Sequence, residues 1–135
     1  MAISKMTAEF PVAAETIWGI ITSLEEYSWR SDIDKIEVAE SGKRFIEYTG
    51  KYATTFTITA WEPCKRYEFT MENENMQGHW TGIFTEQAEK TRIDFTEKVE
   101  AKKWFMKPFV GMYLKKQQAG YLKDLQQALE KDREE

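Results

Sequence analysis

Apolar residues recur at every second position in six successive segments between residues 34 and 100. The clearest alternation runs over residues 52–60. A period of two is typical of β-strands that bury one face. Short turn sequences separate the segments, such as SGK at 41–43, EPCK at 62–65 and NEN at 73–75. Because these turns have the spacing of hairpins, the sequence predicts six antiparallel strands in a meander.

One more strand and a first helix precede this run. Residues 3–10 also alternate, which predicts a strand that Pro11 ends. Apolar residues then follow helical spacing and predict a helix near 13–23. A second short turn of helix is expected at 23–28. The six strands therefore follow one strand and two helical segments.

A long helical pattern closes the chain. The period returns to 3.6 from about residue 103 and continues to about residue 131, a length of about 42 Å for one helix. Pro108 and Gly111 should delay its start or bend it. This element is the only one long enough to cover a seven-stranded twisted sheet. The tail at 131–135 is expected to fray.

Four stretches, in this order, resemble a known superfamily. They are FPVAAETIWGIITSLEEYSWRSDI (10–33), ITAWEPCKRYEF (58–69), EKTRIDFTEKVEA (89–101) and YLKDLQQALEK (121–131). The chain resembles the helix-grip fold of the START-like, polyketide cyclase and birch-pollen-allergen (SRPBCC) superfamily. The expected fold is α+β: a strand, two helices, six antiparallel strands and a long C-terminal helix packed on the curved sheet. A single ligand-binding domain is expected over residues 1–135.

The resemblance implies a deep, mostly apolar cavity between the sheet and the C-terminal helix. Members of the superfamily bind lipids, sterols, polyketides, quinones or plant hormones there. The first hypothesis is therefore binding of a small, mostly apolar molecule. The second is an enzyme of the polyketide cyclase or dehydratase kind in the same cavity. The third is an interaction module like the chaperone activators of the superfamily, for which a filled core and an exposed aromatic patch at 104–109 would be the sign.

The inward positions of the predicted strands supply most candidate ligand-binding residues, since aromatic rings can line a cavity and tyrosine hydroxyls can orient a polar group. They are Tyr48, Tyr52, Phe56, Tyr67, Phe69, Trp80, Phe84 and Phe95. Trp29, in the loop after the first helix, and Phe109 and Met112, near the start of the long helix, complete the set. Gly78 and Gly82 flank Trp80 on one face and leave room beside its ring.

Glu97 shares the inward parity of the last strand, where a carboxylate must be paired, neutral or close to water. It is a candidate polar anchor or general acid, and a salt bridge at the rim is the alternative. His79 is the second weak catalytic candidate because its pKa ordinarily lies near neutrality. It should point outward if Trp80 points inward. Arg30 could bind a ligand carboxylate or be solvated.

Composition excludes several classes. The net charge of −4 with mixed signs argues against nucleic-acid binding. One Cys and one His cannot form a usual zinc site, and no glycine-rich phosphate loop exists, so no metal or cofactor is expected. Cys64 alone forms no internal disulfide. No apolar run of membrane-spanning length occurs, so a cytoplasmic protein without stable membrane insertion is expected, either monomer or dimer.

Overall fold

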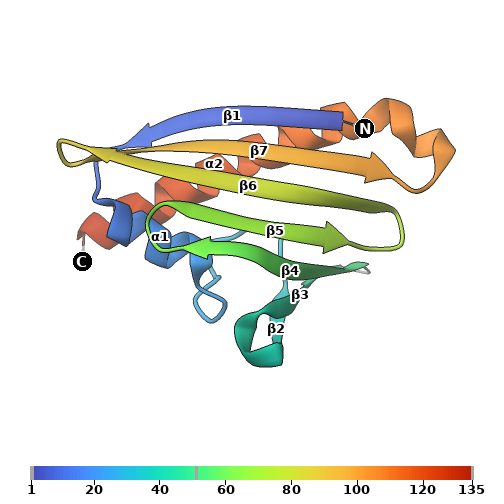
Figure 1. The fold of residues 1–135 in the computed structure, drawn as a ribbon, viewed down its shortest axis with the longest axis horizontal. Helices are drawn as coiled ribbons and strands as arrows, with labels where there is room; N and C mark the ends of the chain where they lie inside the picture. Colours follow the sequence, from blue (N-terminus) through green and yellow to red (C-terminus); the bar gives the residue numbers. More distant parts are fainter. Residues whose placement is uncertain (1, 51, 135) are drawn as a thin grey trace.

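Seven antiparallel strands form one sheet in the computed structural model, which describes residues 2–50 and 52–134, the last three without their side chains. The strands are β1 (Ala2–Phe10), β2 (Lys35–Ala39), β3 (Arg44–Thr49), β4 (Tyr52–Glu62), β5 (Arg66–Glu72), β6 (Met76–Gln87) and β7 (Lys90–Ala101). The helices are α1 (Ala14–Thr22), the 3-10 segments η1 (Glu40–Gly42) and η2 (Trp104–Phe109), and α2 (Val110–Glu134). The strand order is β1-β7-β6-β5-β4-β3-β2, so the first strand pairs with the last (Figure 1).

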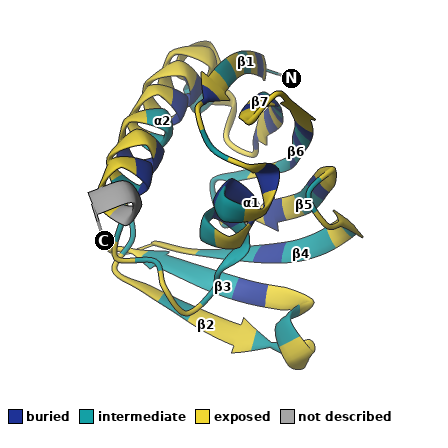
Figure 2. Ribbon diagram, turned by 90° about the vertical axis from the view of Figure 1, so that its left-hand side faces the viewer, coloured by how far each residue is buried: buried dark blue, intermediate teal, exposed yellow. Residues whose placement is uncertain are grey.

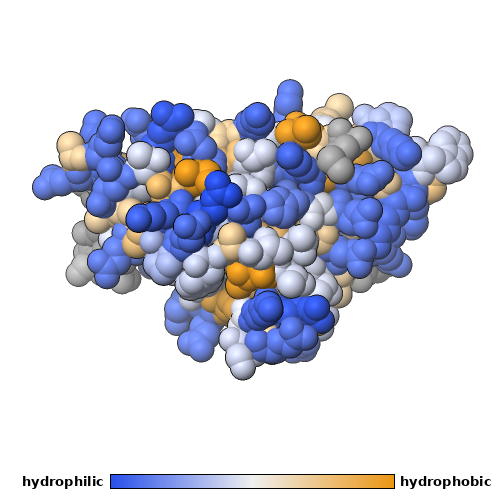
Figure 3. Space-filling view, in the orientation of Figure 1, coloured by the Kyte–Doolittle hydropathy of each residue, from blue (hydrophilic) through white to orange (hydrophobic). Residues whose placement is uncertain are grey.

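The predicted helix-grip fold is confirmed. Each alternating segment of the sequence forms a strand, and buried residues face one another across neighbouring strands, as Phe45 and Phe56 do. Figure 2 shows the sheet curving from β1, beside α2, down to β2, with α1 on the concave side. The opposite face of the sheet is mostly hydrophilic, with small separate hydrophobic areas (Figure 3). Strand periodicity thus separates a core face from a solvent face.

Helix α2 packs against β1 and β7 and touches α1. Its buried apolar residues and Gln118 follow helical spacing: Val110, Leu114, Gln118, Leu125 and Leu129, with Asp124 buried beside Leu125. Pro108 lies in η2, so the α-helix begins only at Val110, as expected from its missing N–H. No helix in the described part of the chain is both long and apolar enough to cross a bilayer.

Two sequence predictions concern the ends of the helices. The second helical turn at 23–28 is wrong, because these residues form bends and a turn. Ser23 ends α1 with extended backbone, and its Oγ accepts a hydrogen bond from the Glu26 N–H at 3.0 Å. That bond offers the backbone an alternative to helix. The fraying expected at 131–135 falls partly outside the described residues, since α2 runs to Glu134 and residue 135 is not described.

Candidate functional site

A cavity of about 100 Å³ lies between the concave face of the sheet, α2 and the loop of residues 23–32. Six rings of the sheet line it, and we call them the aromatic wall: Phe45, Phe56, Tyr67, Phe69, Trp80 and Phe95. Phe69 stacks on Trp80 and Phe45 stacks on Phe56, with ring centroids 4.9 Å apart in each pair. The register of β3 to β7 places these rings on one face, because inward positions of adjacent strands oppose one another.

The aromatic wall has little spare room. A Cβ at Gly82 would lie 2.6 Å from the Trp80 ring, so the indole of Trp80 itself occupies the space that this glycine leaves. A Cβ at Gly78 would collide with the backbone oxygen of Lys98. The two glycines therefore allow close packing of Trp80 and of β6 on β7, and they do not enlarge the cavity. The cavity is small beside those that hold drug-sized ligands, which measure about 300–1,000 Å³.

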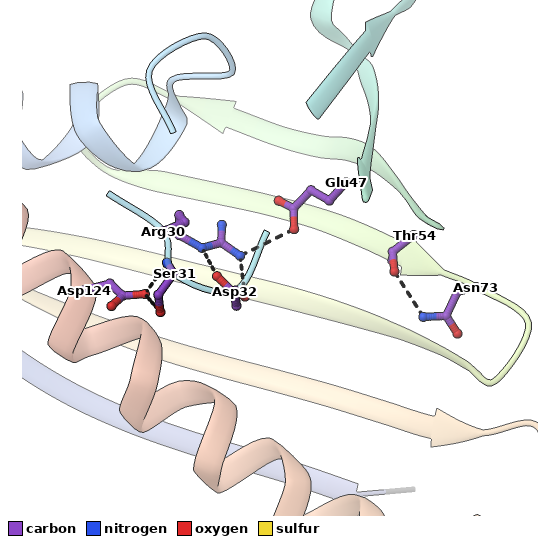
Figure 4. Close-up of polar contacts among 7 residues, drawn as sticks. All are labelled: Arg30, Ser31, Asp32, Glu47, Thr54, Asn73 and Asp124. Carbon is purple, nitrogen blue, oxygen red and sulfur yellow. Dashed lines mark hydrogen bonds and ion pairs between the residues drawn. The ribbon is translucent and has the colours of Figure 1, made fainter. Parts of the chain in front are cut away.

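One end of the cavity is charged. The Arg30 guanidinium binds both carboxylate oxygens of Asp32 at 2.9 Å and lies 3.4 Å from Glu47 Oε1 (Figure 4). Its carbon lies 5.7 Å from the centre of the Trp29 ring and 5.2 Å from that of Tyr121, within cation–π range. Burial lowers the pKa of Arg30, but the hydrogen bonds to Asp32 and the charge of Glu47 raise it by more. The pKa therefore lies above its ordinary value and the guanidinium stays charged.

Burial raises the pKa of two carboxyl groups at this end. The pKa of Glu97 rises to about 7, against the opposing effects of the Gln118 amide and the Arg30 charge. Burial also raises the pKa of Glu47, again opposed by Arg30. For Asp32, burial acts upward, but the hydrogen bond and charge of Arg30 outweigh it and lower the pKa. The site thus combines the ion pair of Arg30 and Asp32 with a Glu97 carboxyl group that can hold a proton near neutral pH.

The loop of residues 23–32 carries an unpaired hydrogen-bond donor and is attached to α2 by two hydrogen bonds. Trp29 Nε1 is buried and has no hydrogen-bond partner within the described residues. Such a donor is costly unless something pairs with it. Ser31 donates from its backbone N–H and its Oγ to Asp124 Oδ2, at 2.9 and 2.8 Å, which fixes the loop to α2 (Figure 4). Burial raises the pKa of the Tyr67 and Tyr121 hydroxyls, so both remain neutral donors.

A sequence profile described as "Polyketide cyclase / dehydrase and lipid transport" matches residues 1–130. The chain belongs to this family. Similar solved structures show the same START-like fold. A START superfamily protein from Mycobacterium smegmatis is 14% identical, with a TM-score of 0.84 over 97% of this chain and 99% of that one. A conserved protein from Geobacillus kaustophilus is 15% identical, with a TM-score of 0.80 over 96% and 95%.

A third structure is described as a putative protein in the dynemicin biosynthetic locus. It is 13% identical, with a TM-score of 0.75 over 96% of this chain and 48% of that one. The comparison with curated proteins found no match. At these identities the solved structures establish the fold of this family member, and the function has to be argued from its cavity.

Seven predicted site residues of this family member lie around the cavity: Trp29, Phe56, Tyr67, Phe69, Trp80, Phe95 and Glu97. Their role in binding stays a prediction. The sequence allows Trp29 to be either a lid of the cavity or a plug for the core, with the plug favoured, and the ring packs edge-on against Tyr121 with centroids 5.5 Å apart. The parity of β7 places Glu97 inside, as predicted, because Phe95 and Val99 share its face.

Five predicted ligand-binding residues lie away from the cavity. The inward assignment of Tyr48 is wrong: Phe45 and Glu47 face inward on β3, so Tyr48 faces outward and its hydroxyl donates to Glu37 at 2.9 Å. Tyr52 has the right parity but starts β4, beyond the cover of the helices, and is exposed. Phe84 is buried against Trp18 of α1 instead, with centroids 5.1 Å apart.

The other two are Phe109 and Met112, which are exposed. The buried face of α2 starts at Val110 and Leu114, so positions 109 and 112 lie off that face. His79 points to the outer face of the sheet, where its ring contacts Glu68 and Thr81. It is therefore far less suited than Glu97 to chemistry in the cavity.

Sequence reasoning missed most of the charged end. Glu47, Asp32 and Tyr121 line the cavity but were not singled out. The odd parity of Phe45, the only aromatic ring of β3 besides Tyr48, is the signal that could have placed Glu47 inside. The sequence offered Arg30 as a ligand contact or a solvated residue. Its burial depends on contacts with Trp29 and Tyr121, which periodicity does not predict.

Proposed function

We propose that this protein binds a small, mostly apolar ring compound that carries a neutral oxygen group, such as a phenol or a ketone. The observation that supports this most directly is the buried, unpartnered Nε1 of Trp29, a residue that lines a cavity whose sheet side is formed by the aromatic wall. Aromatic faces favour a flat apolar body, and a buried donor favours an acceptor oxygen. The family description, which includes polyketide and lipid chemistry, is consistent with this class.

The charges favour a neutral ligand over an anion. Three carboxyl groups, of Asp32, Glu47 and Glu97, face the single guanidinium of Arg30. Asp32 already occupies the bidentate face of Arg30, so a ligand carboxylate would have to displace it. In contrast, a protonated Glu97 can donate a hydrogen bond to a ketone or hydroxyl oxygen. Simple carboxylates are therefore expected to bind poorly.

The volume restricts the size of the ligand. About 100 Å³ suits at most one ring, and a two-ring compound requires rings of the aromatic wall to change rotamer. We also propose that the whole chain is a single domain. A cytoplasmic location is proposed as well, in keeping with the free thiol of Cys64.

The test compares 2-naphthol with 2-naphthoate, which differ mainly in charge, by isothermal titration calorimetry at neutral pH. We expect the naphthol to bind and the naphthoate to bind at least about tenfold more weakly. Replacing Trp29 with Phe keeps the ring but removes the donor, and should weaken naphthol binding by about fivefold, the effect of one hydrogen bond. Failure of both compounds, together with no co-purified molecule in native mass spectrometry, would contradict the proposal.

A second candidate function is catalysis in the same cavity, favoured by the pKa of Glu97 near 7. A general acid works best with a pKa near the working pH. In dehydration of a cyclised polyketide-like substrate, Glu97 could protonate the departing hydroxyl, which leaves as water. The resulting Glu97 carboxylate could then take the proton from the adjacent carbon as the double bond forms. A Glu97→Gln variant that binds the ligand as the parent does but no longer turns it over would support the enzyme. Equal turnover by both proteins would exclude this role for Glu97.

A further inference from the structure

An exposed, mostly aromatic surface lies at the junction of η2 and α2, and none of its residues lines the cavity. We call it the end patch: Trp104, Phe105, Phe109, Met112 and Tyr113. Trp104 is 80% exposed, Met112 73% and Phe109 65%. Met106 and Val110 hold this segment to the protein by packing beside Val99 and Leu114. Side chains of this size gathered on one surface mark an interaction site more often than a solvent face.

The end patch lies in the most basic segment of the chain. Residues 101–123 contain six lysines and no acidic residue, although the whole chain has 23 acidic residues against 19 basic ones. Lys103, Lys107, Lys115 and Lys116 are exposed, and none forms an ion pair with another described residue. Lys102 alone is paired, with Glu72 at 3.2 Å. Aromatic rings interleaved with unpaired lysines are the composition of a segment that binds an anionic lipid surface.

The end patch continues along α2 to the mouth of the cavity. Tyr113, Gln117 and Tyr121 are spaced by four residues and lie along one side of α2. Tyr113 belongs to the end patch, whereas Gln117 and Tyr121 line the cavity. Burial and the negative charges of Glu97 and Asp32 raise the pKa of Tyr113.

We propose that the end patch docks this protein reversibly on an anionic membrane surface, with the aromatic side chains at the headgroup level and the lysines on the lipid phosphates. Docking of this kind needs no membrane-spanning helix. It would bring the mouth of the cavity next to the bilayer, a source of apolar ligand. Pairing of two end patches in a dimer is disfavoured, since a two-fold axis would place lysines opposite lysines. The inference goes beyond the proposed function and does not depend on the ligand.

The test is co-sedimentation of the full chain with vesicles of equimolar phosphatidylcholine and phosphatidylglycerol, beside vesicles of phosphatidylcholine alone. We expect binding to the anionic vesicles only, weakened by added salt. The double variant Lys103→Glu/Lys107→Glu should lower the partition coefficient at least about tenfold, because two attractive charges become repulsive. Trp104→Ala/Phe105→Ala should lower it by a similar factor through lost insertion.

Matched controls separate the end patch from general charge and aromatic content. Lys43→Glu/Lys90→Glu changes two exposed lysines elsewhere, and Tyr52→Ala removes a half-exposed ring at the edge of β4. Both should bind as the parent does. Equal binding to neutral and anionic vesicles, or equal losses in the controls, would overturn the proposal. So would a dimer in light scattering that Trp104→Ala/Phe105→Ala converts to monomer, which would assign the surface to a second copy.

Discussion

The aromatic wall and the end patch are both rich in large rings, yet the chain buries one and exposes the other. In the aromatic wall, Phe95 is 3% exposed and Trp80 8%, whereas Trp104 is 80% exposed. Neither hydrophobicity nor ring count separates them. The wall residues lie on strands whose period of two aims them at the helices, whereas η2 has no buried residue at all. Whether an element points a ring at the core therefore decides if that ring stabilises the fold or remains free to bind.

The largest contrast should appear when a ring is removed from each region. Phe95→Ala should lower the free energy of unfolding by about 3–5 kcal/mol, since the ring packs between Trp80 and Tyr121 and leaves a cavity. Trp104→Ala should change it by under about 0.5 kcal/mol, as for exposed sites. Urea denaturation measures both. Similar losses in the two variants would mean that the end patch is part of the core.

The charged end of the wall region should show a pH dependence that the end patch lacks. The pKa of Glu97 is about 7 in the folded protein and 4.5 ordinarily, so the folded state binds more protons between these values. Stability from this group is therefore present below about pH 4.5 and is lost as pH rises through about 7. Glu97→Gln should remove the loss and gain up to about 3 kcal/mol over the parent at about pH 8.

Denaturation of both proteins at about pH 5 and about pH 8 measures this difference, and the lysine variant Lys103→Glu serves as a control outside the cavity. An advantage of Glu97→Gln that is the same at both pH values would argue against a raised pKa.

Two glycines offer a smaller and sharper contrast. Gly82→Ala should destabilise by about 1–3 kcal/mol, because the new methyl group would meet the Trp80 ring, which Phe69 holds in place. Gly120 in α2 is exposed, and a Cβ added there would meet nothing within 4 Å, so Gly120→Ala should stabilise by about 0.5–1 kcal/mol. Thermal denaturation gives both shifts, and a gain in both variants would show that Trp80 can move.

The smallest effect concerns the loop of residues 23–32. Asp124→Ala removes the acceptor of both hydrogen bonds from Ser31. It should lower the free energy of unfolding by about 1 kcal/mol, because water can replace the lost acceptor. Hydrogen exchange of the loop amides should quicken more than that of β6 or β7. Faster exchange across the whole sheet would mean that the loop stabilises the fold globally.

The fold could be predicted from the sequence because periodicity is a property of neighbouring residues. Strand β7 shows this well: Ile93, Phe95, Glu97 and Val99 alternate, and the structure buries all four. The site was predicted only in part, because it depends on contacts between distant segments. Arg30 and Asp32 lie in a loop and Tyr121 lies in α2, and no local sequence pattern predicts that they are in contact.

Single positions at the ends of elements were the other source of error. Tyr48 and Phe45 lie three residues apart on β3, so choosing one as inward excludes the other, and the choice also decides where Glu47 points. Phe109 and Met112 are apolar, but Phe109 precedes α2 and Met112 lies on the side of the helix opposite the buried Val110 and Leu114.

The attachment of the loop to α2 by Ser31 and Asp124 has a kinetic consequence. The seven-stranded sheet can stay intact while those two hydrogen bonds break. A ligand could then bind and dissociate at rates set by loop opening, and weakening the attachment would raise the association and dissociation rates by the same factor. Residence time could thus be tuned over a wide range while the dissociation constant stays the same.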